Sequence, residues 1–402
     1  MTRRSRTWGL AALGLLAAYA SGCGAASRLS LGVRGHPESS SYEAPRLAGL
    51  ATLRWRVELV VPVDLESRSR TRATPAVDVA RGVVYVGGLD HGLHALRVSD
   101  GGELWRFHTL GPVEGTPVLD AGALYVGCND GALYALDAVT GRMRWRFATA
   151  AEVVHAPLVI GDSVYFVNAD DTIFALNRAT GEQRWRYRRD PPTGITGGGH
   201  AGLYKRGHAL ITGFSDGHVI ALDTTDGTVT WDRDTSEDTE NTTSANESHQ
   251  AIDVDTTPVE VAGNLFAASY TAGLYALDPD GGGVRWRLDT LKDISALAED
   301  GRHLYAVSAT AGLLKLSPSD GSVVWARNLG SAALVRPMVV GALLFVSTGD
   351  AGLWAVRRSD GEPLQGLCPG GLYGQPAIVG RHLFVESNHS TVQAWVLGND
   401  PE

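Results

Sequence analysis

The side chains that could do chemistry in this 402-residue chain are twelve histidines, three cysteines and several neighbouring carboxylates. The histidines form no zinc-protease signature of the His-Glu-x-x-His kind. Three glycines precede His200, but no Lys-Ser or Lys-Thr pair follows them, as a phosphate-binding loop would require. Asp170 and Asp171 fall in a predicted hairpin turn, and turn formation accounts for both carboxylates. We therefore predict no catalytic residue, no metal site and no bound cofactor.

The elements that position these side chains come from one repeated pattern. Alanine and tryptophan stand ten residues apart at Ala135 and Trp145, with Leu-Asp after the alanine and Thr-Gly midway. The separation recurs, with Lys315 and Gln365 as variant ends, at Ala95 to Trp105, Ala175 to Trp185, Ala221 to Trp231, Ala276 to Trp286, Lys315 to Trp325 and Ala355 to Gln365. A proline usually stands 18 residues before the alanine, and a short aromatic or β-branched run lies between the two.

Each unit thus holds four short apolar stretches separated by turn residues such as Asn129-Asp130-Gly131 and Thr140-Gly141. Short apolar runs joined by Asp-Gly and Asn-Gly turns are typical of antiparallel hairpins. Four strands in about 40 to 45 residues are typical of a propeller blade. We expect the glycines to supply the positive φ angles of the turns and one indole per blade to pack between neighbouring sheets.

Seven such units run from Pro75 to Gln365. Residues 376–395 supply three further strands, and the Trp-Arg stretch at residues 53–57 supplies the fourth. The sequence therefore predicts an all-β fold, an eight-bladed β-propeller over residues 51–398 in which the two ends of the chain share one blade. Closing the ring in this way removes open sheet edges.

Residues 1–22 have the features of an export signal. Arginines precede an apolar stretch that runs from Trp8 to Ala20 and is too short to span a bilayer. Ala20-Ser21-Gly22-Cys23 resembles the lipobox of bacterial lipoproteins, although that family prefers leucine where this chain has Ala20. The resemblance implies lipidation at Cys23 and sorting to the outer membrane, and the alternative is an ordinary signal peptide cut near Ala20 or Gly22. We expect residues 23–50 to be the lipidated cysteine and a flexible tether.

The net charge argues against one class of partner, and the number of cysteines argues against one class of fold. A net charge of −9 without a long basic run argues against nucleic acid. Three cysteines are too few for a disulfide scaffold. Cys128 and Cys368 belong to different predicted blades, so we do not expect them to pair.

The Ala-Leu-Asp-x-x-Thr-Gly-x-x-x-Trp pattern resembles the quinoprotein-type propeller repeat. Two groups of proteins carry it, the PQQ-dependent dehydrogenases and the BamB family of outer-membrane assembly lipoproteins. The PQQ-dependent dehydrogenases have adjacent cysteines, a Ca²⁺ ion and a catalytic aspartate. No two cysteines are adjacent in this chain, so the dehydrogenase is kept as a remote alternative.

Function on a regular scaffold is expected where the repeat is broken. The tryptophan of one unit is usually 12 residues before the proline of the next, but Trp231 and Pro258 are 27 apart. Trp185 and Leu203, which stands at the proline position, are 18 apart. These two enlarged connections flank the fourth blade on one face. The longer one begins with the polar stretch 232–250, which we expect to be solvated.

The segment from Asp253 to Pro258 resembles the Asp-Val-Asp-Thr-Thr-Pro motif of the BamB family. That resemblance implies that Asp253, Asp255 and Thr256 contact a periplasmic POTRA domain of the insertase BamA. The alternative is that one aspartate only caps a turn.

The second family contact is a Leu-Arg-Gly stretch, which corresponds to Ile195, Thr196 and Gly197. Because Thr196 replaces the arginine, a charge-assisted anchor is missing.

These resemblances together imply a non-enzymatic outer-membrane lipoprotein that faces the periplasm and is a scaffold in β-barrel assembly, binding a BamA-like insertase. Unfolded outer-membrane proteins are a further candidate partner. The alternative is a lipoprotein of the same fold that serves another envelope complex or binds a ligand in its central channel.

Overall fold

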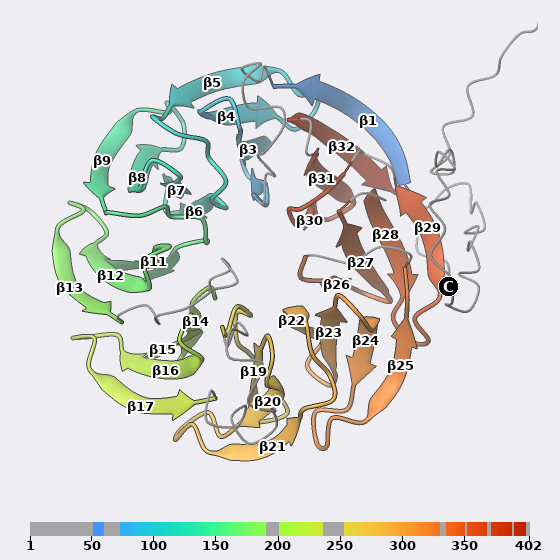
Figure 1. Cartoon of the computed structure of the whole chain (residues 1–402). Helices are drawn as coiled ribbons and strands as arrows, with labels where there is room; N and C mark the ends of the chain where they lie inside the picture. The colour runs from blue at the N-terminus through green and yellow to red at the C-terminus, as the bar shows by residue number, and fades with distance from the viewer. Residues whose placement is uncertain are drawn as a thin grey trace, which may run out of the picture.

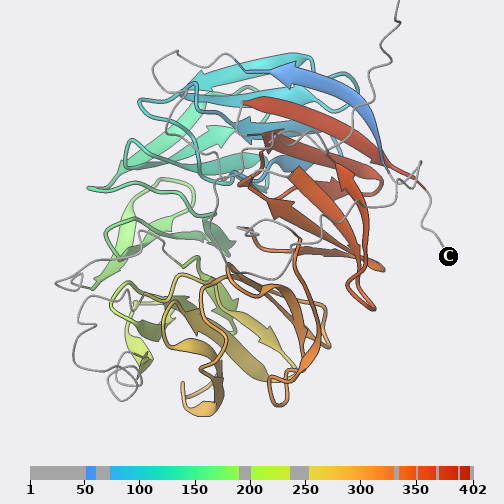
Figure 2. The ribbon, with the colours of Figure 1, turned by 45° about the vertical axis from the view of Figure 1, so that its right-hand side comes forward.

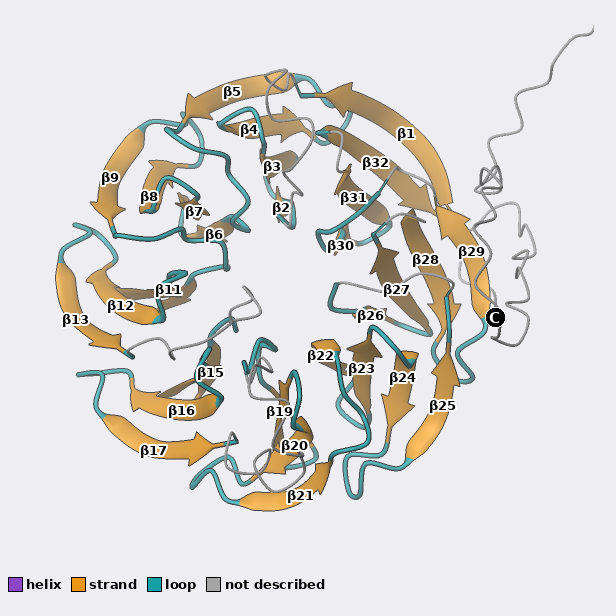
Figure 3. Ribbon diagram, in the orientation of Figure 1, coloured by secondary structure: helices purple, strands orange, loops and turns teal. Residues whose placement is uncertain are grey.

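The computed structural model describes residues 51–59, 73–189, 201–235, 253–329, 335–349, 352–367, 371–387 and 390–398. These residues form eight separate four-stranded antiparallel sheets arranged as the blades of a ring (Figure 1). The part of the chain described contains strands, turns and loops and no helix (Figure 3), so none of it forms a membrane-spanning helix. The prediction of an eight-bladed β-propeller is confirmed.

Each blade has four strands in the same order from the centre of the ring outward. The innermost strands are β2 (Ala76–Asp78), β6 (Val118–Asp120), β10 (Leu158–Ile160), β14 (Tyr204–Arg206), β18 (Val259–Val261), β22 (Ile294–Glu299), β26 (Met338–Val340) and β30 (Ala377–Val379). The second strands are β3 (Val83–Gly87), β7 (Ala123–Cys128), β11 (Ser163–Val167), β15 (Ala209–Gly213), β19 (Asn264–Ser269), β23 (Leu304–Ser308), β27 (Leu343–Thr348) and β31 (His382–Ser387).

The two outer positions complete each blade. The third strands are β4 (Gly92–Arg97), β8 (Ala132–Asp137), β12 (Thr172–Asn177), β16 (His218–Asp223), β20 (Gly273–Leu277), β24 (Gly312–Leu316), β28 (Gly352–Arg357) and β32 (Thr391–Leu397). The outermost strands are β5 (Glu103–His108), β9 (Met143–Ala148), β13 (Gln183–Arg188), β17 (Val229–Asp234), β21 (Val284–Leu288), β25 (Val323–Arg327), β29 (Pro363–Leu367) and β1 (Ala51–Glu58). We number the blades 1 to 8 from the one that begins with β2.

The repeated alanine and tryptophan face each other across the third and fourth strands. Ala135 pairs with Trp145 on one side and with Tyr125 on the other, and the two aromatic rings are 5.8 Å apart. A methyl side chain between them leaves room for the large rings to make contact. The sequence spacing is therefore the spacing of one cross-strand row of side chains.

The first and last strands close the ring. β1 pairs with β32 along its length, and Trp55 stands opposite Ala394 as in the other blades (Figure 1, where blue β1 lies beside red β32). The ring of Trp55 is also 6.1 Å from that of Phe384, which stands opposite Ala394 as Tyr125 stands opposite Ala135. The N-terminal Trp-Arg stretch thus completes the eighth blade as predicted.

The order of strands gives the ring two different faces. Connections between blades lie at the same end of the sheets as the turns between second and third strands. We call this end the insertion face because β17 ends and β18 begins there, on either side of the longest connection in the sequence. The turns between first and second strands and between third and fourth strands form the opposite end, which we call the turn face. Figure 2 shows neighbouring blades side by side around the ring.

Candidate functional site

The segment that ends the longest connection is fixed between blades 4 and 5. Val254 is buried in the cluster between these blades and donates its backbone N–H to the carbonyl of Phe214 at 3.1 Å. A Cβ on Gly213 would lie 2.3 Å from this valine, so the two backbones touch. The close approach needs glycine at that point of β15.

The two neighbours of Val254 face different surroundings. Asp253 is fully buried, and its carbonyl accepts the N–H of Tyr270 at 2.9 Å. Asp255 is half-buried. Of the two side chains, only that of Asp255 is partly exposed, and its Oδ1 atom is buried, whereas the full burial of Asp253 favours a role in holding the segment.

Thr256 also holds the segment from within. Its hydroxyl accepts the N–H of Ala268 at 2.9 Å and lies 3.4 Å from the carbonyl of the same residue, and the side chain is buried. Threonine thus ties the segment to the second strand of blade 5. The next residue extends this arrangement to blade 4, because the Thr257 hydroxyl accepts the N–H of Gly202 at 2.9 Å.

The start of the other enlarged connection is tied to blade 4 as well. The Arg189 guanidinium pairs with Asp216 in the turn between β15 and β16, and with Asp232 on β17 at 3.0 Å. The pKa of Arg189 is raised: burial acts against the charged form, and the two aspartates outweigh it. Arg189 was not among the residues predicted from the sequence, although it follows β13 where the equivalent outer strands are followed by Thr109, Thr149 and Thr235.

The remaining predicted contacts lie outside the described residues. Ile195, Thr196 and Gly197 belong to the stretch 190–200, and the polar insertion continues through residues 236–252. Cys23, the predicted tether and Cys368 are outside the described part as well. What the structure brings together is therefore the described ends of both enlarged connections, which are held against blades 4 and 5.

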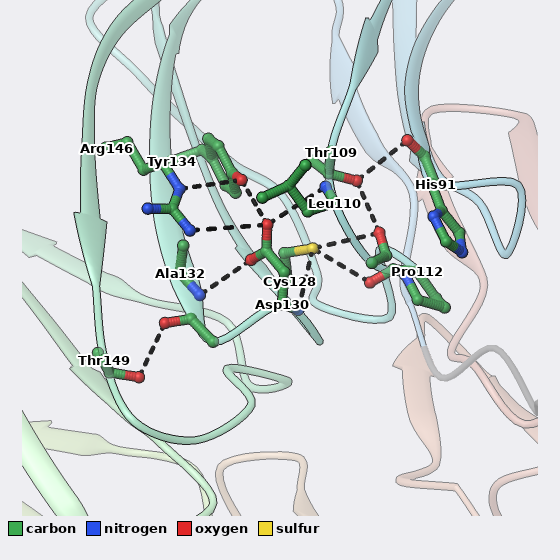
Figure 4. A network of polar contacts seen from close by, with 12 residues as sticks. His91, Thr109, Leu110, Pro112, Cys128, Asp130, Ala132, Tyr134, Arg146 and Thr149 are labelled. Atoms are coloured by element: carbon green, nitrogen blue, oxygen red, sulfur yellow. Dashed lines mark hydrogen bonds and ion pairs between the residues drawn. The ribbon is translucent and has the colours of Figure 1, made fainter.

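The connection from blade 1 to blade 2, which has the usual length, shows how hydrogen bonds hold the insertion face in place (Figure 4). Asp130, in the turn between β7 and β8, accepts the hydroxyl of Tyr134 at 2.5 Å and the N–H of Leu110 at 3.3 Å. Thr109 donates its hydroxyl to the carbonyl of Gly111 at 2.7 Å. These bonds join the connection from blade 1 to a turn of blade 2.

Cys128 lies in the same network, and its surroundings make the thiol unreactive. Its sulfur is buried and donates to the carbonyls of Gly111 and Pro112 at 3.3 Å. Burial raises the pKa of the thiol to about 11, so it is not a candidate nucleophile.

Three residue pairs in the sequence have the three-residue spacing of metal ligands: His91 with His94, Glu152 with His155, and Glu386 with His389, of which His389 is outside the described residues. His94 is instead enclosed by carboxylates, with Nε2 3.1 Å from Asp90 and Nδ1 2.8 Å from Glu103. Within the described residues no group of three or more His, Cys, Asp or Glu side chains could hold a metal ion. These pairs therefore add no metal site to that part of the chain.

Of the adjacent acids Asp170 and Asp171 in the third blade, Asp171 has a role beyond the turn. Asp171 is buried and accepts hydrogen bonds from the backbone N–H and the hydroxyl of Ser215 in blade 4. Turn formation alone does not account for this carboxylate, because it also joins two blades.

Comparison with known proteins agrees with this architecture. The family model described as outer membrane protein assembly factor BamB matches residues 51–132, 93–327 and 271–364. A curated protein of that name from Yersinia pestis is 26% identical over 189 residues, 46% of this chain and 47% of the relative. The chain thus spans about half the length of this relative.

Solved structures share the propeller fold. BamB from Moraxella catarrhalis superposes with a TM-score of 0.69 at 21% identity, covering 86% of this chain and 100% of that one. A quinohemoprotein alcohol dehydrogenase from Pseudomonas putida gives a TM-score of 0.66 at 15% identity, covering 88% of this chain and 77% of that one. The fold alone does not separate the two functions. Since the family model covers most of the sequence, the chain belongs to the family of the outer membrane protein assembly factor BamB.

Proposed function

We propose that this protein is a non-enzymatic scaffold of outer-membrane β-barrel assembly that binds the POTRA region of a BamA-like insertase through its insertion face. The observation that carries the proposal is the fixed segment between blades 4 and 5, where Val254 and Thr256 are anchored and Asp255 between them is partly exposed. A segment held by both blades can meet a partner without losing much conformational freedom on binding. Membership of the BamB family supplies the class of partner.

We further propose that the protein is exported, lipidated at Cys23 and held at the periplasmic side of the outer membrane. Cys23 follows a short apolar stretch and small residues, and residues 24–50 would give the propeller reach from the lipid anchor. The relatives named outer membrane protein assembly factor agree with this location. Unfolded outer-membrane proteins remain a second candidate partner of the same surface.

A pull-down with the POTRA region of the insertase tests the contact. Asp255→Arg reverses a charge on the insertion face, and we expect it to reduce recovery of the insertase by tenfold or more. Glu182→Arg is the matched control, because Glu182 is exposed on the turn face and the charge change is the same. Equal recovery with Asp255→Arg and wild type would remove this residue from the interface. Loss of recovery in both variants would point to a general charge effect.

The same fold also occurs in quinoprotein enzymes, and an enzyme assay tests this alternative. A quinoprotein would reduce dyes with an alcohol as substrate when PQQ and Ca²⁺ are added. We expect no dye reduction with the purified chain, because its sequence lacks the adjacent cysteines of the PQQ-dependent dehydrogenases.

A further inference from the structure

Lys315 breaks the repeat at a buried position. The third strands of the other seven blades carry alanine at this point: Ala95, Ala135, Ala175, Ala221, Ala276, Ala355 and Ala394. Lys315 pairs with Trp325 and Tyr305 as those alanines pair with their neighbours. It is only 7% exposed, and lysine is almost never so buried unless its charge is compensated. The burial lowers the pKa of the ammonium group.

The contact between blades does not require this lysine. Lys315 Nζ donates to the carbonyl of Arg358 at 3.3 Å, and Trp325 donates to the same oxygen at 3.3 Å. The equivalent carbonyl of blade 2, that of Ala138, accepts the hydroxyl of Tyr85 at 2.9 Å and the indole N–H of Trp105 at 3.2 Å, both from blade 1. The alanine of the repeat therefore serves this contact equally well, and the lysine adds a charge that the fold does not need.

The lysine lines a cavity of about 440 Å³ between blades 6 and 7 on the turn face. Its lining combines basic side chains, one acidic side chain and apolar wall residues: Arg302, His303, Lys315, Arg357, Arg358, Asp300, Ser359, Ala342, Leu343 and Leu364. A volume of this size is in the range of small-molecule sites. The basic lining is notable in a chain of net charge −9.

The charges in the cavity are only partly balanced. Asp300 accepts the hydroxyl of Tyr305 at 2.8 Å, and its carboxylate is 3.8 Å from Nε of Arg358. Arg357 is held by Asp360 and Glu362 outside the lining. Asp300 is thus the one carboxylate of the lining, and its side chain also lies 3.3 Å from Nδ1 of His303. Arg302 and Lys315 add two further basic side chains to the same lining.

We propose that this cavity binds the phosphate group of a small organic molecule or lipid headgroup. Lysine offers a point charge and arginine offers paired N–H donors, a combination suited to phosphate oxygens. Ala342, Leu343 and Leu364 provide an apolar wall for the organic part. The cavity is on the turn face, so its occupation is independent of the contact proposed for the insertion face.

Calorimetric titration of the purified full-length chain in a phosphate-free buffer tests this site. The probes are inorganic phosphate, glycerol 3-phosphate and dihexanoyl phosphatidylglycerol, a lipid that is soluble in water. Lys315→Ala restores the residue of the repeat, and we expect it to weaken binding at least tenfold. Lys205→Ala is the matched control, since Lys205 is exposed on β14 in blade 4, and it should bind like wild type.

The pattern of binding identifies the source of the phosphate. Binding of glycerol 3-phosphate that Lys315→Ala weakens supports a soluble phosphate ester, and the same result with the lipid alone supports a headgroup. Arg302→Gln, at an exposed position, repeats the test if Lys315→Ala proves unstable in thermal unfolding. No binding of any probe to wild type, or equal binding to the variants, overturns the proposal.

Discussion

The indole ring of Trp145 lies directly against the backbone of Gly181 in the next blade. A Cβ added to Gly181 would stand 2.7 Å from the ring atom Cδ2, well inside contact distance. The indole Nε1 of the same tryptophan donates to the carbonyl of Arg178, in the same turn, at 3.0 Å. The Thr-Gly and the Trp of the repeat are thus two halves of one contact between neighbouring blades.

Replacement of Gly181 by alanine should destabilise the propeller by about 3 kcal/mol, since it adds a steric clash to the strain of a positive φ. Gly161→Ala in the same blade is the control, because Gly161 also has a positive φ of 59° and nothing lies within 4 Å of the added Cβ. We expect this control to lose only about 1 kcal/mol. Urea unfolding of the three proteins measures the difference, and equal losses would refute the contact as the cause.

Replacement of Thr256 by valine should loosen the segment between blades 4 and 5. Valine keeps the shape but leaves the N–H of Ala268 without its acceptor, at a cost of about 1 to 3 kcal/mol. Thr256→Ser retains the hydroxyl and should lose less. If the segment forms the insertase contact, recovery in the pull-down should fall more with valine than with serine. Equal recovery would separate the anchoring of the segment from binding.

Removal of the Asp300 carboxylate should change how stability depends on pH. Burial by itself raises the pKa of Asp300, but the N–H groups of Arg302 and His303 and the Tyr305 hydroxyl outweigh it and lower the pKa to about 2. A lowered folded-state pKa gives stability that is present above the unfolded value of about 4 and is lost as pH falls toward 2.

For Asp300→Asn we accordingly expect a loss on the order of 2 kcal/mol at pH 6 and a flatter decline between pH 4 and pH 2. Urea unfolding at pH 6, 4 and 2.5 measures both. Asp289→Asn is the control, because Asp289 is exposed and its removal should leave the pH profile of wild type. A decline as steep as that of wild type in Asp300→Asn would contradict the expectation.

The thiol of Cys128 should react slowly in the folded protein. Burial raises its pKa to about 11, so only about one thiol in a thousand is ionised at pH 8. A chain with Cys23→Ser and Cys368→Ser isolates this residue, and its reaction with a disulfide reagent should speed up at least a hundredfold in urea. Equal rates in the folded and unfolded states would show that the thiol is accessible.

The sequence by itself determined the propeller. The spacing of Ala135 and Trp145 repeats because local turns set the length of each hairpin, and one cross-strand row of side chains follows from that length. The eighth blade was also predictable, since the Trp-Arg stretch around Trp55 lacks partners near it in the sequence. The Asp253–Pro258 segment was visible for a related reason, because it departs from the repeat.

Only the tertiary structure decided which side chains of the site are presented. Asp253 and Asp255 look alike in the sequence, but the first is fully buried and the second half-buried. Their difference depends on how the segment packs against Gly213, a contact between blades that no local pattern encodes. Likewise, Lys315 is a single variant of the repeat in sequence, and its basic surroundings appear only when blade 7 brings Arg358 beside it. Packing between blades joins residues about 40 positions apart, so the periodicity of the sequence fixes the blades, and the interfaces between them decide the sites.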